Sequence, residues 1–386
     1  MTGASDLLDL DSDLSDTELA LRATVREFVD RRVRPHIATW FEEARFPIEL
    51  VPELAALGLL GMQISGYGCP GRSAVEYGLA AEELEAGDSG IRTFVSVQGS
   101  LAMTAIARFG SEEQRNAWLP RMARGEAIGC FGLTEPTAGS DPSSMRTTAR
   151  RDGGEWVLEG AKRWIGLASI ADVAVVWART EEGVRGFLVP TGTPGFTATP
   201  ITGKLSMRAS IQCDVLLEDV RLPETAVLPG STGLGSAFAC LNEARYGIAW
   251  GAVGAARDSF DAALAHAGAR TQFGRPIAAF QLTQEKLVDM ALGIQKAQLV
   301  ALRIGRLKDA GRLAPHMISF AKLDNTRTAI EVARTARTIL GGDGVTLEHS
   351  PLRHASNLEA VRTYEGTDEV HTLVLGQRLT GIAAFR

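Results

Sequence analysis

Features that mark several classes of protein are scarce or absent in this sequence. It has four cysteines in 386 residues, all far apart and without a CxxC spacing, so neither a zinc site nor a disulfide framework is expected. Lys and Arg number 40 against 46 Asp and Glu, and the net charge is -6, which argues against a nucleic-acid partner. No apolar run is long enough to span a bilayer. We therefore expect no metal ion, no nucleic acid and no membrane insertion.

The N-terminal segment also lacks targeting features. It reads MTGASDLLDLDSDLSD, without the basic stretch and apolar core of a secretory signal and without the arginines of a mitochondrial transit peptide. We expect a cytoplasmic protein whose cysteines are reduced thiols, because disulfides rarely persist in a reducing compartment.

What the sequence does contain divides it into three regions, of which the first is helical. From about residue 15 to 130, apolar residues recur at helical spacing. Ser15 to Glu18 form a capping-box signature at the start of this region. Further helices are expected at 47–60, 74–85 and 99–109.

The second region carries a β pattern. Short β-type runs lie at 156–158, 173–177, 186–189 and 215–217, separated by Gly, Pro, Asp and Thr. No helix-length segment intervenes, so a small antiparallel barrel or sandwich is expected rather than a βαβ unit.

The third region, from about residue 235, is helical again and rich in alanine, which is typical of a bundle. We therefore expect a multidomain α+β protein. Its domains are an all-α domain at 1–130, an antiparallel β-barrel or sandwich at 131–232 and a four-helix bundle at 233–386.

Three short stretches are candidates for chemistry. Residues 131–141 (FGLTEPTAGSD) join the helical region to the β region, and their small side chains let a backbone approach a ligand closely. Glu365 lies in the segment YEGT, and a carboxylate in an apolar setting has a raised pKa that suits proton abstraction. Residues 270–276 (RTQFGRP) offer an arginine for phosphate and a ring for stacking. The structural alternatives for these three stretches are, in the same order, an ordinary turn, a solvated glutamate and a helix end.

Together these stretches resemble the signature motifs of the acyl-CoA dehydrogenase family. LTEP-x-x-GSD matches residues 133–141, R-x-Q-F-G matches 270–274, LGG-x-G matches 340–344 and YEGT matches 364–367. The order and separations agree, and the resemblance covers nearly the whole chain. It implies the family's α–β–α architecture and FAD-dependent α,β-desaturation of an acyl-CoA.

The resemblance also implies roles for individual residues. The thioester carbonyl would accept hydrogen bonds from the Glu365 backbone N–H and from a ribityl hydroxyl of FAD, which stabilise an enolate. The Glu365 carboxylate would take the α-proton, and the β-hydrogen would leave as hydride to the flavin. Implied FAD contacts are Phe131, Leu133, Thr134, Gly139, Ser140, Trp164, Ile165, Gly166, Arg270, Phe273, Gln281, Leu340, Gly341, Gly342, Gly344, Thr367 and Glu369.

Some of these contacts would be made across a subunit boundary. In the family, the residues that match Arg270, Phe273, Gln281 and 340–344 reach the FAD of a neighbouring subunit. The resemblance therefore implies a dimer at least, and a homotetramer built as a dimer of dimers.

Within the family, the resemblance is strongest to the glutaryl-CoA dehydrogenase branch. These enzymes carry an arginine at the position of Arg92 that receives the distal carboxylate of the substrate, and a guanidinium can hold a carboxylate by two parallel hydrogen bonds. The branch implies decarboxylation to crotonyl-CoA and electron transfer to electron-transfer flavoprotein. Implied substrate contacts are Arg92, Thr93, Ser140, Arg245, Tyr364 and Gly366.

Alternatives remain at two positions. Arg92 could form a structural salt bridge with Glu85 or Asp88. Gly166 stands where most relatives carry a hydroxyl, and Trp-Ile-Gly also occurs in a short-chain acyl-CoA oxidase type. A short-chain oxidase, or a dehydrogenase for another acyl thioester, is therefore the second hypothesis. A non-catalytic flavin-binding scaffold is disfavoured because Glu365 is present.

Overall fold

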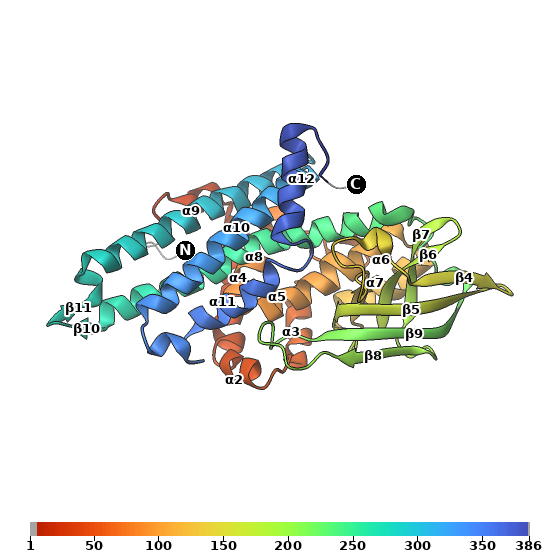
Figure 1. Cartoon of the computed structure of the whole chain (residues 1–386), viewed down its shortest axis with the longest axis horizontal. Helices are drawn as coiled ribbons and strands as arrows, with labels where there is room; N and C mark the ends of the chain where they lie inside the picture. The colour runs from red at the N-terminus through yellow and green to blue at the C-terminus, as the bar shows by residue number, and fades with distance from the viewer. Residues whose placement is uncertain (1–5, 385–386) are drawn as a thin grey trace.

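The computed structural model describes residues 6–384, so the first residues of the acidic N-terminal segment and the last two residues lie outside it. Figure 1 shows the helices gathered along most of the molecule and the strands of the middle region at one end of it. The expected α+β architecture, with a β region between two helical regions, is confirmed. No helix within residues 6–384 is long and apolar enough to cross a membrane.

The N-terminal region is a set of helices that begin at well-defined caps. The predicted capping box is present, with the Ser15 side chain accepting from the Glu18 N–H and the Glu18 carboxylate accepting from the Ser15 N–H. Ser73 caps the helix that was expected at 74–85 in the same way. The helices are α1 (Asp16–Phe28), α2 (Ile37–Glu42), α3 (Val51–Ala56), α4 (Ala74–Gly87), α5 (Ser89–Val95), α6 (Thr104–Phe109) and α7 (Glu112–Ala123).

Two expected helices differ from the structure in detail. The segment 47–60 forms α3 over only Val51–Ala56, because Gly58 turns the chain with a φ of 68°. The segment 99–109 ends as α6, but it begins in a π-helix, η4 (Ser96–Met103), that continues α5 without a break. The wider turns of a π-helix frequently occur at functional sites.

The middle region is one curled sheet with the strand order β3-β6-β4-β5-β9-β8 and with β7 paired to β6. Most pairs are antiparallel as expected, but β3 and β4 both run parallel to β6. The strands are β3 (Gly129–Gly132), β4 (Thr148–Asp152), β5 (Glu155–Gly166), β6 (Val173–Thr180), β7 (Gly183–Pro190), β8 (Phe196–Pro200) and β9 (Gln212–Pro223). Two short hairpins lie outside this sheet, β1 (Ser65–Gly66) with β2 (Cys69–Pro70) and β10 (Thr271–Gln272) with β11 (Arg275–Pro276).

The C-terminal region consists of long helices that pack on one another and on the N-terminal helices. These are α8 (Gly233–Ala269), α9 (Gln281–Asp309), α10 (Pro315–Ile339), α11 (Ser350–Val361) and α12 (Asp368–Thr380). The division into domains at 130/131 and 232/233 stays a prediction; the first cut falls inside β3, and the second falls at the start of α8.

Helix α8 approaches α4 closely because glycines face α4 along it. A Cβ at Gly247 would lie 2.4 Å from the Tyr77 hydroxyl oxygen, and a Cβ at Gly254 would lie 1.9 Å from the Glu82 carbonyl oxygen. A contact of that kind with backbone cannot be relieved by a side-chain rotation. The two helices can therefore pack at this distance only if these positions lack side chains.

This packing predicts the effect of Gly254→Ala. Overpacking a core costs roughly 1–3 kcal/mol, so the free energy of unfolding should fall by that amount, measured by denaturant titration. Gly268→Ala in the same helix is the control, because no atom lies within 4 Å of its Cβ position. The control should be neutral or stabilising by up to about 1 kcal/mol. Equal stability of the two variants would contradict the close-packing argument.

Candidate active site

The candidate site is built around the turn between α11 and α12. Glu365 has a φ of 55° and Gly366 a φ of 102°, so both residues lie in the left-handed region. Glycine adopts this conformation readily, whereas a residue with a side chain does so at an energetic cost. A strained residue of this kind persists only where its surroundings hold it, and it often marks a functional site.

Two cations hold the backbone of this turn from neighbouring helices. The Lys322 ammonium, on α10, donates to the carbonyl oxygen of Tyr364 at 2.5 Å and to that of Gly366. The Arg245 Nε, on α8, donates to the Glu365 carbonyl oxygen at 2.7 Å. Three successive carbonyls therefore point toward positive charge.

One oxygen of the Glu365 carboxylate has no hydrogen-bond partner among the residues that the structure describes. This oxygen, Oε2, is buried. Burial raises the pKa of Glu365, and the nearby charges of Arg92, Lys322 and Arg245 oppose this shift. A carboxylate with an unpaired oxygen and a raised pKa is suited to accept a proton from a bound molecule.

Arg92 lies beside this turn and is only 1% exposed. Its Nε donates to Glu85 Oε2 at 2.6 Å, and its Nη2 donates to the Tyr364 hydroxyl. Ser89 holds the other Glu85 oxygen at 2.8 Å. The Arg92 Nη1 atom is buried and has no partner among residues 6–384. Because a buried guanidinium N–H is costly to leave unpaired, this atom is placed to bind a ligand.

Of the two salt bridges that Arg92 could form as a purely structural residue, only the one with Glu85 is present. Its salt bridge with Glu85 exists, and Gly251 makes room for it, since a Cβ there would lie 2.0 Å from Glu85 Oε2. The other candidate, Asp88, pairs instead with Arg353 at 2.5 Å. The salt bridge holds the arginine and leaves Nη1 free.

Thr93 completes this cluster, with its hydroxyl 3.5 Å from that of Tyr364. The structure thus brings together residues from α5, α8, α10 and the 364–366 turn. Of the residues predicted from the sequence, this cluster contains Arg92, Thr93, Arg245, Tyr364, Glu365 and Gly366.

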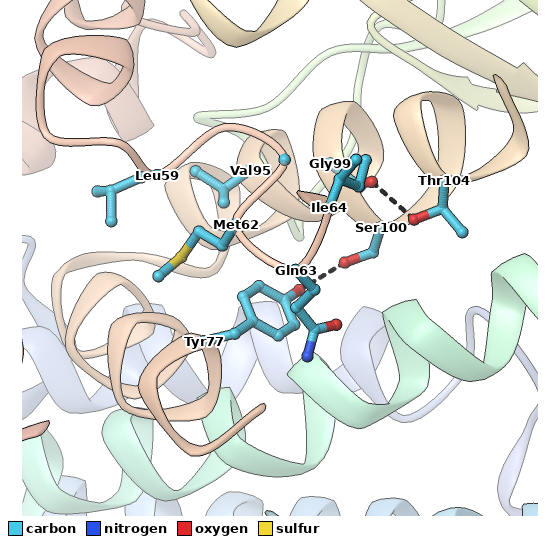
Figure 2. Close-up of a pocket in the computed structure, with 10 residues that line it drawn as sticks. Leu59, Met62, Gln63, Ile64, Tyr77, Val95, Gly99, Ser100 and Thr104 are labelled. Carbon is cyan, nitrogen blue, oxygen red and sulfur yellow. Dashed lines mark hydrogen bonds between the residues drawn. The ribbon is translucent and has the colours of Figure 1, made fainter. Parts of the chain in front are cut away.

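A small cavity adjoins the helix that carries Arg92 (Figure 2). It is lined by Tyr77 of α4, by Val95 of α5 and by Ser100 of the π-helix, and the Tyr77 and Ser100 hydroxyls lie 2.8 Å apart. Its volume of about 10 Å³ is about the space that one water molecule needs. It is therefore too small for an acyl chain and is not the candidate site.

A larger cavity of about 550 Å³ lies between η2 (Val29–Val33), α8 and the start of α11. Charged residues that are already ion-paired line much of it, among them Arg34 and Arg257. Neither Glu365 nor Arg92 lines it, so it is separate from the candidate site.

A second part of the predicted site lies where β3 leaves the sheet. Glu135 braces this loop by accepting from the backbone N–H of Thr147 at 3.0 Å and from the buried Lys162 ammonium at 2.8 Å. The Arg163 N–H donates to the Thr134 carbonyl at 2.9 Å, which places Trp164 next to the loop. Trp164 has a φ of 62° at a β-bulge and is 52% exposed. An aromatic side chain with so much exposed surface is available to a planar ligand.

The other predicted cofactor residues of this region lie in or near the same loop and bulge. Gly139 and Ser140 are exposed in the loop, and Gly166 ends β5, while the side chains of Phe131, Leu133 and Ile165 are buried beneath. Thr367 caps α12 by accepting from the Val370 N–H, and Glu369 is exposed in the first turn of that helix.

The remaining predicted residues are not brought into this site. Arg270 caps the C-terminus of α8, and Phe273 lies in the β10–β11 hairpin that follows, at the end of the molecule opposite the sheet (Figure 1). Phe273 is 93% exposed, and Gln281 begins α9 near the same hairpin. The segment 340–344, with the predicted residues Leu340, Gly341, Gly342 and Gly344, follows the C-terminus of α10.

Lys322 is a residue that sequence reasoning missed. It is 1% exposed, on the same face of α10 as the buried Ile318 and Thr326. The signal in the sequence was a lysine at helical spacing from residues of the buried face. A lysine is almost never fully buried unless it has a partner, so its position on that face indicated a specific contact.

Comparison with known proteins agrees with this architecture. Three models of acyl-CoA dehydrogenase match the chain, the N-terminal domain over residues 15–126, the middle domain over 130–220 and the C-terminal domain over 231–380. The chain belongs to the acyl-CoA dehydrogenase family. Within residues 6–384 of this dehydrogenase, no group of His, Cys, Asp or Glu residues is arranged to hold a metal ion.

Individual relatives of this acyl-CoA dehydrogenase include a short-chain specific enzyme and two glutaryl-CoA dehydrogenase structures. A short-chain specific mitochondrial acyl-CoA dehydrogenase of Bos taurus is 37% identical over 95% of this chain and 91% of its own. A crystal structure of glutaryl-CoA dehydrogenase from Mycobacterium smegmatis is 61% identical with a TM-score of 0.98 and covers 100% of both chains. A glutaryl-CoA dehydrogenase structure from the same organism, in complex with FADH2, is 57% identical with a TM-score of 0.98 over 98% of each chain.

The buried ion pair of this dehydrogenase predicts the effect of Glu85→Gln. Removing one partner of a buried pair costs roughly 3–5 kcal/mol, so chemical denaturation should show a stability loss of that order. Glu126→Gln is the control, because Glu126 and Arg124 form an exposed pair, and exposed pairs contribute little to stability. A loss for Glu85→Gln as small as that of the control would show that the pair does not hold Arg92.

Proposed function

We propose that this acyl-CoA dehydrogenase desaturates a short-chain dicarboxylic acyl-CoA, with glutaryl-CoA as its substrate. The observation that carries the proposal is that two buried polar groups without hydrogen-bond partners belong to the same cluster of residues. The buried Glu365 Oε2 and the buried Arg92 Nη1 both lack partners among the described residues, and Tyr364 lies between their residues in contact with Arg92.

Glu365 is the proposed base. Its Oε2 atom accepts no hydrogen bond from the described residues and its pKa is raised by burial, so it can remove the proton next to a thioester carbonyl. Its strained backbone, held by Lys322 and Arg245, keeps the residue in one orientation. Positioning of this kind is a large part of what an enzyme contributes to proton abstraction.

Arg92 is the proposed specificity residue. Its Nη1 offers a charge-assisted hydrogen bond to a carboxylate at the far end of the acyl chain. A monocarboxylic acyl group would leave this N–H without a partner in a buried setting, which is penalised. The arginine therefore favours a dicarboxylic substrate over a simple acyl-CoA.

The cofactor that fits this chain is FAD. The exposed face of Trp164 and the small residues Gly139 and Ser140 form a surface that a planar ring system can cover. The FADH2 bound to a glutaryl-CoA dehydrogenase of 57% identity supports this assignment. When bound, FAD supplies the acceptor for the β-hydrogen.

Decarboxylation follows from the proposed substrate. After desaturation, the distal carboxylate of a glutaryl chain is vinylogous to the thioester carbonyl, so loss of CO2 leaves a dienolate. Glu365, which is protonated at this stage, can return its proton to give crotonyl-CoA. We propose that the two electrons pass on to electron-transfer flavoprotein, as the family resemblance implies.

A second candidate is oxidation of a short monocarboxylic acyl-CoA. The 37% identity to a short-chain specific enzyme favours it. Gly166 provides no hydroxyl near Trp164, and because Trp-Ile-Gly also occurs in an acyl-CoA oxidase type, oxygen is the alternative electron acceptor. Steady release of hydrogen peroxide during turnover would identify an oxidase.

The proposed assembly is a homotetramer, with at least a dimer needed for FAD. Arg270 and Phe273 are exposed and lie at or next to the β10–β11 hairpin, at the end of the molecule opposite the sheet that contains Trp164, so we expect them to meet a flavin of another subunit. Large apolar residues are also exposed along α9, as expected for a buried interface. These are Leu282, Val288, Leu292 and Leu299.

Glu365→Gln tests the base. The variant should keep its FAD and bind acyl-CoA, but flavin reduction should slow by at least roughly 10²–10⁴-fold. In the wild-type enzyme the rate should rise with pH through the raised pKa of Glu365, because only the carboxylate accepts a proton. Stopped-flow absorbance under anaerobic conditions measures both. Reduction of the variant at a near wild-type rate would exclude Glu365 as the base.

Arg92→Met tests the substrate. It should lower kcat/KM for glutaryl-CoA by at least about tenfold to a hundredfold, since a charge-assisted hydrogen bond is lost. Turnover of butyryl-CoA, which has no distal carboxylate, should hold or improve. Arg353→Met is the control, because it removes another buried arginine, paired with Asp88. The control should affect both substrates alike, and an unchanged ratio in Arg92→Met would make Arg92 structural.

A further inference from the structure

We propose that Lys322 is a positioning residue whose ammonium group holds the 364–366 turn in the conformation that the base requires. The inference rests on the proposed function of Glu365 and extends it to a residue on a different helix. No sequence motif marks this lysine.

The contacts of Lys322 are made to backbone and not to a carboxylate. Its Nζ donates to the carbonyls of Tyr364 and Gly366, which flank Glu365 in the chain. Arg245 donates to the carbonyl between them. A single group that binds both flanking peptides restricts the rotation of the residue between them, so the direction of the Glu365 side chain depends on Lys322.

The turn needs this restraint because its backbone is unfavourable. Glu365 has a φ of 55°, which residues with a side chain rarely adopt. Position 366 has no room for a side chain either, since a Cβ there would lie 2.8 Å from His371 Nε2. Without the lysine, we expect the turn to relax toward conformations that aim the carboxylate elsewhere.

The charge of Lys322 also acts on the base. The ionisable groups that face it are Glu365 from the turn, Arg245 from α8, Arg92 from α5, and Asp368 and His371 from α12. Burial lowers the pKa of Lys322 to about 7, with the Glu365 charge opposing the shift. The cation in turn lowers the pKa of Glu365, so a neutral residue at 322 should raise that pKa further.

Lys322→Met and Lys322→Arg, in the FAD-loaded enzyme, separate positioning from simple packing. Lys322→Met should lower kcat at least about tenfold with little change in KM. It should also move the acid limb of the pH–rate profile to higher pH, because the cation that lowers the pKa of Glu365 is removed. Lys322→Arg keeps the charge and should recover most of kcat and the wild-type midpoint. Lys322→Gln supplies a second neutral variant with a donor to one carbonyl.

The matched control is Lys204→Met. Lys204 is a partly buried lysine, and it donates to the carbonyls of Met207 and Ser210, away from Glu365. Burial lowers its pKa to about 8. The control should lose stability without moving the acid limb. A folded Lys322→Met enzyme with wild-type kcat and an unmoved midpoint overturns the proposal, as does Lys322→Arg performing no better than Lys322→Met.

Hydrogen exchange of the segment 362–367 gives a readout that does not depend on turnover. In the wild-type protein without acyl-CoA, protection of these amides should fall as the pH rises through about 7, where Lys322 loses its charge. Constant protection across this range overturns the proposal even if the variants fail to fold. If no acyl-CoA reduces the wild-type flavin while protection changes as expected, the proposed function fails and the restraint of the turn stands.

Discussion

The close approach of α4 and α8 is the constraint on which the site depends. Gly247, Gly251 and Gly254 lie one turn apart on the face of α8 that meets α4, and at each a Cβ would collide with an atom of α4. Because Gly251 lacks a side chain, the Glu85 carboxylate can lie against α8 and bind Arg92. The helix packing thus decides where the arginine is held and which of its N–H groups remains free.

Several charges are buried together around the 364–366 turn, and their balance is unusual for a structural core. Burial disfavours the charged forms of Glu365 and Lys322, while each stabilises the charge of the other. The pKa of the carboxyl is raised and that of the ammonium is lowered, so both move toward neutral pH. Groups with pKa values shifted in this way are common at catalytic sites, and here the shifts arise from helices that converge from distant parts of the chain.

The two ends of the molecule carry complementary halves of the predicted flavin site. The loop after β3 and the exposed Trp164 lie beside the sheet, whereas Arg270 and Phe273 lie at the opposite end of the helical region. The residues predicted to contact the flavin therefore form two separate groups within one chain. The exposed apolar side chains of α9 lie on the same long helical region as the hairpin, so assembly and cofactor binding would be linked.

Local patterns in the sequence determined the α–β–α order, the capping box at Ser15 and the position of Glu365 in its motif. These features depend on neighbouring residues and on helix or strand periodicity, which a sequence displays directly. The parallel pairing of β3 with β6, the π-helix after α5 and the role of Lys322 were decided by the tertiary structure. Lys322 and Gly366 are 44 positions apart, and only the packing of α10 against the turn makes a buried ammonium a partner for its carbonyls.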